Sequence, residues 1–296
     1  MTRIAAVIVS YNSAEVLKDC LSSLPRDLAG VVVADNASRD ESVRVAEAAG
    51  CRIVQLGRNA GYAAAINAAV ATLDLGAVDA VLVLNPDCRL APGSLPVLAR
   101  ALDRPGCGIA VPKLVNSDGS LQPSLRRAPT VTRALAQAVL GGTLAGRSSR
   151  LGELVTDPAA YERPCPAAWA TGAAMLVATP LVRAAGPWEE SFLLYSEETE
   201  YALRAADLGW SLWYEPEAVF EHIGGESDTS PMLAALIAVN RVRLFRDRNG
   251  PVRGAAYFAA VLLGEAVRAL RGQRTARAAL VALVRPARRL RKLPGG

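Results

Sequence analysis

Short runs of aliphatic residues alternate with amphipathic segments through the first third of the chain. The aliphatic runs predict buried strands at residues 4–9, 31–34, 52–56 and 78–84. The segments between them predict helices at residues 14–24, 40–49 and 61–73. Strands that alternate with helices in this way form parallel sheets with right-handed crossovers. The pattern therefore predicts an α/β domain with a mostly parallel sheet and helices on both faces, which is typical of nucleotide binding.

Beyond residue 84 the periodicity is mixed. It predicts a helix at 94–102, strands at 108–115 and 167–178, and a turn at 116–119. Residues 124–166 are rich in Gly, Arg and Pro and lack a regular period, so we expect an irregular insertion there, a candidate flap beside the site. Another helix is predicted to follow Ser196, which could cap it, and a strand is predicted at residues 218–221.

The last part of the chain is helical and basic. Helices are predicted at 231–249, 252–271 and 275–293, which divides the chain into an α/β domain (1–230) and a C-terminal extension (231–296). Arginines recur among Leu, Val and Ala in this extension. A basic amphipathic helix can lie on an anionic membrane surface, or it can pack on its own domain or on a second copy of the chain. Both interpretations remain open from the sequence.

Composition excludes several classes of protein. Of 296 residues, 51% are hydrophobic, so a folded core is expected rather than disorder. The net charge of +5 is too small and too unevenly placed to predict a nucleic-acid partner. The five cysteines contain no C-x-x-C pair and fit a reducing cytosol better than a disulfide framework or a zinc site. No signal peptide or run of spanning length is evident, so we expect a cytoplasmic protein that can still contact a membrane.

The fourth predicted strand ends abruptly at Asn85-Pro86-Asp87. Proline cannot donate to a sheet ladder, so the strand stops there and the Asp87 carboxylate lies at its carboxyl end. Ligands of open parallel sheets gather at that edge, where a carboxylate can hold a divalent cation. Taken alone, the same residues also describe a simple turn.

Two other segments bring polar groups to the same edge. Asp35 follows the second strand, where it can accept hydrogen bonds from a base or ribose, or cap the next helix. Small residues around Asn59 and Gly61 begin the third helix, whose free N–H groups suit a diphosphate. The segment is neither a G-x-G-x-x-G nor a Walker A loop, so no dinucleotide or ATP cradle is predicted.

A second acidic cluster begins the helix after Ser196. Glu197 or Glu198 could act as a general base if the fold brings the helix start to the sheet edge. Early glutamates also favour the positive end of a helix dipole, and Glu200 with Arg204 forms an ordinary i,i+4 pair. His222 is the only histidine, and a lone histidine is more often a packed or surface residue than a ligand.

Taken in order, these segments resemble a family-2 glycosyltransferase of the GT-A fold, a family of inverting enzymes that use nucleotide-sugar donors. The resemblance spans residues 3–227 and is closest to bacterial rhamnosyltransferases of cell-wall linker synthesis. It is carried by seven motifs, which are Val9-Ser10-Tyr11-Asn12, Val33-Ala34-Asp35-Asn36-Ala37-Ser38, Asn59-Ala60-Gly61-Tyr62 with Asn67, Asn85-Pro86-Asp87, Thr171-Gly172-Ala173, Tyr195-Ser196-Glu197-Glu198 with Arg204, and His222.

The resemblance implies a role for each matched residue. Asp87 and His222 would bind Mg²⁺ or Mn²⁺ on the donor diphosphate, and imidazole favours Mn²⁺. Glu198, or its neighbour Glu197, would be the general base. The remaining matched residues would bind the nucleotide-sugar donor, and they are Ser10, Tyr11, Asp35, Asn59, Gly61, Asn67, Asn85 and Arg204. Asn85 replaces the first acid of the family's D-x-D motif, which leaves fewer carboxylates for the metal, and aspartate is the commoner family base.

The function implied is inverting transfer of L-rhamnose from dTDP-rhamnose to a polyprenyl-diphosphate-linked N-acetylglucosamine at the inner face of the cell membrane. Two alternatives remain, a UDP-sugar transferase for another surface glycan and a non-catalytic sugar-nucleotide-binding subunit. A binding subunit has no need of a base, which counts against the second. A nucleotidyltransferase would need a basic phosphate-binding loop near the first strand, and the sequence has none there.

Overall fold

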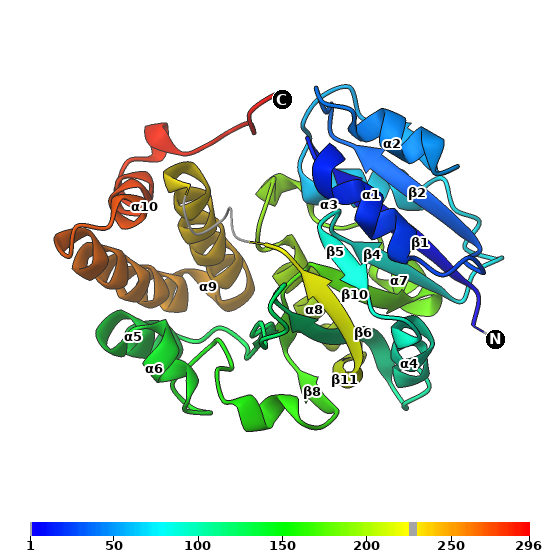
Figure 1. Ribbon diagram of the computed structural model, residues 1–296. Helices are drawn as coiled ribbons and strands as arrows, with labels where there is room; N and C mark the ends of the chain where they lie inside the picture. The colour runs from blue at the N-terminus through cyan, green and yellow to red at the C-terminus, as the bar shows by residue number, and fades with distance from the viewer. Residues whose placement is uncertain (1, 225–229) are drawn as a thin grey trace.

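A mixed nine-stranded sheet forms the centre of the computed structural model, which describes residues 2–224 and 230–296 (Figure 1). The strand order is β3-β2-β1-β4-β10-β6-β11-β5, and β8 pairs with β11 outside this path. The strands are β1 (Ile4–Ser10), β2 (Gly30–Asp35), β3 (Arg52–Gln55), β4 (Ala80–Leu84), β5 (Cys88–Leu90), β6 (Cys107–Val115), β8 (Cys165–Ala167), β10 (Ala174–Ala178) and β11 (Ser211–His222).

The first four strands are parallel, as the sequence predicts. Strand β10 then runs antiparallel to both β4 and β6, while β11 is parallel to β6 and antiparallel to β5. The sheet is therefore mostly parallel on its N-terminal side and mixed beyond β4. This arrangement brings the carboxyl ends of β1, β2 and β4 to one edge, and the β11–β5 pairing carries the end of β11 toward the same edge.

Helices cover both faces of the sheet because buried strands alternate their side chains between the faces. In β1, Ile4, Ala6 and Ile8 belong to one core cluster, and Val7 and Val9 belong to the other. The first cluster includes residues of α1 (Ala14–Ser23), α2 (Ser42–Ala48) and α4 (Ser94–Ala101). The second includes residues of α3 (Tyr62–Val70), α7 (Thr179–Ala185) and α8 (Glu197–Asp207). The predicted α/β architecture is confirmed.

Two predictions between residues 124 and 178 are wrong. The irregular insertion contains a regular helix, α5 (Val131–Leu140), whose N-cap Thr130 accepts a hydrogen bond from the Arg133 N–H at 3.1 Å. It also contains α6 (Gly142–Gly146) and β7 (Leu125–Arg126), which pairs with β9 (Trp169–Ala170). The predicted strand at 167–178 is interrupted after β9, because residues 171–173 leave the ladder before β10 begins.

The C-terminal helices form a separate layer beside the sheet domain (Figure 1). Helix α9 (Pro231–Leu270) is broken at Gly250, whose φ is 80°, so it consists of the two helices that the sequence predicts. Helix α10 (Arg274–Val284) ends earlier than predicted, because Pro286 follows closely and cannot continue a helix. No described helix combines the length and apolarity that would let it cross a membrane.

A third core holds the C-terminal helices together, and α5 contributes to it. Ala134 of α5 packs with Phe245 and Tyr257 of α9 and with Leu283 of α10. The helix that the sequence analysis missed therefore joins the insertion to the C-terminal extension.

Candidate active site

Asp87 and His222 meet at the end of the β5–β11 pair. Antiparallel pairing sets His222 opposite Cys88, next in the chain to Asp87. The His222 Nε2 atom lies 3.5 Å from the Asp87 Oδ1 atom. The backbone N–H of Gly224 donates to the Asp87 Oδ2 atom at 3.0 Å. The fold thus joins two residues that are 135 positions apart in the chain (222 − 87), and it was resemblance rather than spacing that paired them.

Gln122 fixes the orientation of the His222 ring. Its Oε1 atom lies 2.6 Å from His222 Nδ1, and its Nε2 atom donates to the His222 carbonyl at 3.3 Å and to Asn116 Oδ1 at 3.0 Å. Because Gln122 presents its oxygen to Nδ1, that nitrogen carries the hydrogen and the Nε2 lone pair points toward Asp87. Burial lowers the pKa of His222 although the nearby Asp87 carboxylate opposes the shift, which favours the neutral ring.

The donor atoms of this site fit a divalent cation. The Asp87 Oδ1 atom is buried and has no hydrogen-bond partner among the residues that the structure describes, although a buried carboxylate oxygen normally has one. A metal ion would satisfy it together with the free lone pair of His222. The Cys88 thiol lies within 4.8 Å of both groups but donates to the Ala173 carbonyl, and burial raises its pKa well above the usual value. Both the hydrogen bond to Ala173 and the raised pKa favour the protonated thiol.

Glu197 and Glu198 begin α8 near the same site. Burial raises the pKa of the Tyr62 hydroxyl well above its usual value, and Cys88, the two glutamates and Asp87 add to the shift. Tyr62 donates to the Gly172 carbonyl at 2.9 Å, and a Cβ on Gly172 would lie 3.1 Å from the Glu198 Cβ. Gly172 therefore packs closely against Glu198.

The two glutamates differ in exposure. Glu197 is 2% exposed and its Oε2 atom has no hydrogen-bond partner among the described residues, while Glu198 is only partly buried. Burial raises the pKa of both carboxyls. Of the two carboxylates, that of Glu198 is therefore the more accessible. The Ser196 side chain, which could have capped α8, makes no capping hydrogen bond.

Arg126 is a site residue that the sequence analysis missed. Its positive charge lowers the pKa of Glu198 and so opposes the effect of burial on that carboxyl. The guanidinium stacks 5.6 Å from the Trp169 ring and donates to the carbonyls of Pro123 and Leu125. Arg126 lies in the part of the insertion without a clear period, and no motif marked it.

The predicted base-binding residues gather at the ends of β1 and β2. Asp35 and Ser10 are paired across the ladder and nearly fully buried, yet Asp35 Oδ1 and Ser10 Oγ lack hydrogen-bond partners among the described residues. The Asp35 Oδ2 atom accepts the Ser38 N–H at 2.9 Å. Gly61 has a φ of +97°, and a Cβ there would lie 2.0 Å from the Leu193 carbonyl oxygen, so only glycine fits.

Residues near the end of the chain contact two of the predicted donor-binding residues. The Tyr11 hydroxyl and the Asn59 amide each donate to the Pro294 carbonyl at 3.0 Å. The Asn59 backbone N–H donates to the Gly295 carbonyl, also at 3.0 Å, and Leu293 is buried. The segment at 293–296 therefore covers this part of the predicted nucleotide pocket, as its course toward the N-terminal helices in Figure 1 suggests.

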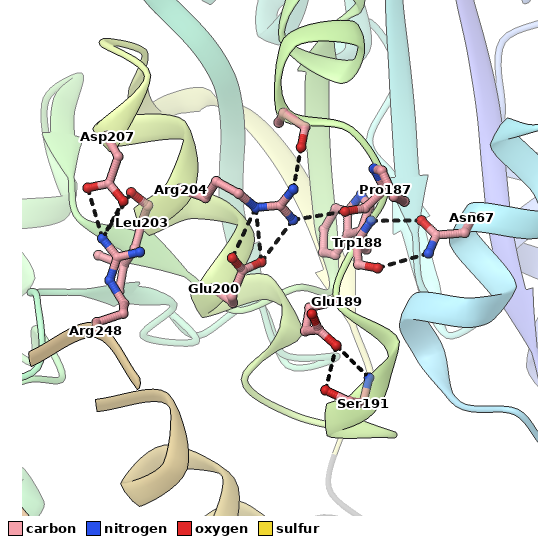
Figure 2. Close-up of polar contacts among 11 residues, drawn as sticks. Asn67, Pro187, Trp188, Glu189, Ser191, Glu200, Leu203, Arg204, Asp207 and Arg248 are labelled. Atoms are coloured by element: carbon pink, nitrogen blue, oxygen red, sulfur yellow. Dashed lines mark hydrogen bonds and ion pairs between the residues drawn. The ribbon is translucent and has the colours of Figure 1, made fainter. Parts of the chain in front are cut away.

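Asn67 and Arg204 hold a loop in place (Figure 2). Asn67 exchanges two hydrogen bonds with the Trp188 backbone and donates to Glu190. Arg204 pairs with Glu200 and donates to the carbonyls of Ala185 and Pro187. Their polar groups are thus engaged with residues 185–190 rather than directed to a ligand. Asn85 lies beside Asp87, and its backbone N–H donates to the Ala173 carbonyl.

A mixed α/β sheet with a carboxylate–imidazole pair and a glutamate at one edge fits a GT-A glycosyltransferase, and comparison with known proteins agrees. Residues 5–149 match the model of glycosyl transferase family 2. An N-acetylglucosaminyl-diphospho-decaprenol L-rhamnosyltransferase of Mycobacterium tuberculosis is 32% identical over 244 residues, which cover 75% of this chain and 76% of the relative. A low-salt glycan biosynthesis hexosyltransferase, Agl10 of Haloferax volcanii, is 26% identical over 68% of this chain and 61% of its own length.

Solved structures share the fold. A mannosyltransferase from Pyrobaculum calidifontis, in complex with GDP-Man and Mn²⁺, matches with a TM-score of 0.58 and 16% identity over 97% of this chain and 80% of that chain. Glucosyl-3-phosphoglycerate synthase from Mycobacterium tuberculosis, in complex with Mn²⁺ and UDP, matches with a TM-score of 0.55 and 16% identity over 84% and 81%. The chain belongs to glycosyl transferase family 2 and is a glycosyltransferase.

Proposed function

We propose that the protein transfers L-rhamnose from dTDP-rhamnose to a polyprenyl-diphosphate-linked N-acetylglucosamine with inversion at the anomeric carbon. The relative at 32% identity is named for this acceptor class and this sugar, which supports the choice. The observation that carries the chemistry is the turn at Gly172 and Ala173, where Gly172 packs against Glu198 and the Ala173 carbonyl accepts hydrogen bonds from Asn85 and Cys88, on either side of Asp87 in the chain. A metal-binding carboxylate and a base candidate at one place are what a direct displacement requires.

Glu198 accepts the proton of the attacking acceptor hydroxyl. The hydroxyl oxygen bonds to the anomeric carbon as the bond from that carbon to the donor diphosphate breaks, and the nucleoside diphosphate leaves with the electron pair. Burial makes the Glu198 carboxylate a stronger base, and the charge of Arg126 keeps it ionised for this role.

Asp87 and the Nε2 atom of His222 are the protein ligands of the cation, which we propose to be Mn²⁺ or Mg²⁺. When bound, such an ion neutralises charge on a leaving diphosphate. Gln122 holds the imidazole ready for this contact. Asp35 and Ser10 offer unpaired oxygens to the base or ribose of the donor. The mannosyltransferase and the synthase with the same fold were solved in complex with Mn²⁺, which supports a metal-dependent reaction.

The first experiment titrates the protein with dTDP-rhamnose and UDP-glucose, with and without Mn²⁺, and measures transfer to the lipid-linked acceptor. Glu198→Gln should lower kcat by about 10²–10⁴-fold and leave the donor Kd unchanged, because only the proton acceptor is lost. Glu197→Gln is the matched comparison and should retain most of the activity. A preference for the UDP-sugar would replace the donor assignment with the alternative one, and full activity of Glu198→Gln would reject the base.

We also propose that the enzyme acts as a peripheral protein at the inner face of the cell membrane. Exposed apolar side chains of the C-terminal helices, including Val252, Leu270 and Val284, lie among arginines, which suits an anionic lipid surface. Co-sedimentation with anionic vesicles tests this. If the protein instead forms a concentration-dependent dimer that does not bind the vesicles, these helices pack on a second copy of the chain.

A further inference from the structure

An apolar groove of about 700 Å³ lies within the C-terminal helices. Its walls come from the two arms of α9 and from α10, and its apolar lining includes Val239, Val242, Ala255, Phe258 and Leu283. The volume lies in the range typical of small-molecule sites, roughly 300–1,000 Å³. It is separate from the Asp87–His222 site, and the mechanism above makes no use of it.

The groove exists because α9 is bent back on itself. Gly250 has a φ of 80° and Pro251 follows it, so the helix breaks and its arms pack side by side. Close approach of the arms requires Gly254, where a Cβ would lie 2.6 Å from the Arg246 Cγ. Glycine at position 254 and alanine at position 255 let the backbones approach each other. Because these residues fill little space, the groove is left between the arms.

Three arginines stand around this apolar lining. Arg243, Arg246 and Arg289 all line the groove. Arg289 donates to the last carbonyls of α10. Arg243 donates to Ser191 and forms an ion pair with Asp247, an acidic residue that also lines the groove, at 3.5 Å. Arg246 is exposed, and its guanidinium has no hydrogen bond or ion pair with any residue that the structure describes. The apolar groove complements a long hydrocarbon chain, and the unpaired Arg246 guanidinium at its edge complements a phosphate group.

The groove borders the loop that leads to the proposed base. Arg243 contacts Ser191 with two hydrogen bonds, and its guanidinium lies 5.0 Å from the centre of the Phe192 ring. One turn earlier on α9, Asn240 donates to the carbonyls of Phe192, Leu194 and Tyr195. Glu197 and Glu198 follow this loop directly. A ligand with its chain in the groove can therefore direct its other end toward the start of α8.

We infer that this groove binds the polyprenyl chain of the acceptor lipid, with the acceptor diphosphate at Arg246. The inference rests on the proposed function, since it names the part of the enzyme that holds the lipid half of that acceptor. The hydrocarbon chain contacts Val242, Phe258 and Leu283, and the sugar end extends past residues 191–196 toward Glu198. Chain length then affects acceptor binding and leaves donor binding unchanged.

The test compares two acceptors with the same sugar diphosphate, one bearing a long polyprenyl chain and one a short alkyl chain. The wild-type protein should have a KM at least about tenfold lower for the long chain, since burial of a few methylene groups suffices for that ratio. Ala255→Phe, which fills the groove, should remove this preference and leave the donor Kd and the KM for the short acceptor unchanged. Arg246→Gln should raise the KM for both acceptors, because both carry the diphosphate.

Matched controls lie on the same helix and outside the groove. Ala256→Phe and Arg253→Gln are exposed and line no part of it, so they should behave as the wild type. An unchanged chain-length preference in Ala255→Phe overturns the inference. Two other results for Ala255→Phe, each with an unchanged chain-length preference, also overturn it. Loss of binding to anionic vesicles would assign the groove to phospholipid. A change of molar mass in sedimentation would assign it to a second copy of the chain.

A second measurement keeps the inference apart from the proposed reaction. Polyprenyl diphosphate that carries no sugar should compete with a fluorescent polyprenyl phosphate for the wild type, and Ala255→Phe should weaken this binding about tenfold. This binding needs neither donor nor transfer. If the wild type binds the lipid but transfers no rhamnose, the proposed function fails and the groove assignment stands. If it transfers rhamnose and Ala255→Phe binds the lipid normally, the groove assignment fails alone.

Discussion

At the scale of single residues, one amide controls the metal-binding imidazole. Gln122→Met keeps the volume of the side chain but removes the acceptor that holds the hydrogen on His222 Nδ1. Because partners behind a ligand tune metal affinity, Mn²⁺ binding should weaken about 10–100-fold. Electron paramagnetic resonance titration of Mn²⁺ in the presence of dTDP measures this, and the exposed Gln273→Met is the control. Unchanged affinity would show that the ring needs no such partner.

The buried Glu197 carboxyl should make stability depend on pH. Burial raises its pKa well above the usual value, so its contribution to stability is full below the unfolded-state pKa and is lost as pH rises through the folded-state pKa. The Glu197→Gln variant has no carboxyl at this position, so its stability does not fall in this way as the pH rises. Its free energy of unfolding should exceed that of the wild type by about 1–3 kcal/mol near pH 8, and the difference should shrink toward pH 5. Denaturant unfolding at both pH values measures it, with the exposed Glu162→Gln as control. A difference that does not vary with pH would contradict the prediction.

The site residues differ in how far the sequence could predict them. Asp87 at a strand end followed from the proline beside it, but the residues alone allowed an ordinary turn. His222 alone looked like a packing residue, and resemblance to a family paired it with Asp87. Gln122 and Arg126 act through contacts across the fold that leave no local pattern. The roles of Asn67 and Arg204 in the structure also depend on tertiary contacts. Asn67, for example, bonds to a loop that lies about 120 residues later in the chain.

At the scale of elements, α9 anchors the loop before the proposed base. Asn240 donates to the carbonyls of Phe192, Leu194 and Tyr195, and Leu193, Tyr195 and Ser196 have positive φ angles. Asn240→Ala removes a donor that three loop carbonyls share and so loosens this strained backbone. We expect a loss of about 1–3 kcal/mol in stability and a fall in kcat at unchanged donor Kd. Thermal unfolding and steady-state kinetics measure both.

Asn249→Ala provides the control for this prediction, because Asn249 lies on the same helix and its side-chain amide donates to the local Phe245 carbonyl. It should have little effect on kcat. A normal kcat for Asn240→Ala would mean that the loop holds its shape without α9.

The elements themselves were predictable where one residue type dominated. Aliphatic runs placed β1, β2, β3, β4 and β6 within two residues, because strands buried on both faces need uninterrupted apolar side chains. Helix α5 was missed since its buried positions are alanines, which give a weak periodic signal, and its packing partner lies a hundred residues later. The antiparallel insertion of β10 between β4 and β6 depends on long-range pairing, which no local pattern encodes.

At the scale of the whole molecule, the segment at 293–296 should compete with the donor. Tyr11 and Asn59, which we propose as donor-binding residues, bond to the carbonyls of Pro294 and Gly295. Leu293→Ser removes the buried anchor of this segment and should tighten dTDP binding several-fold, roughly 1 kcal/mol. Calorimetric titration measures it, and Leu290→Ser, at a less buried position, is the control. Equal affinities in wild type and variant would mean that nucleotide and segment bind side by side.

The position of this segment also has a kinetic consequence. A nucleotide that needs Tyr11 and Asn59 can bind only in molecules whose segment has moved away, so association becomes a two-step event. The observed rate in a stopped-flow experiment should then rise with nucleotide concentration and level off at the rate of segment opening. That plateau would set an upper limit on turnover. However fast the chemical step at Glu198 is, kcat could not exceed the rate at which residues 293–296 open.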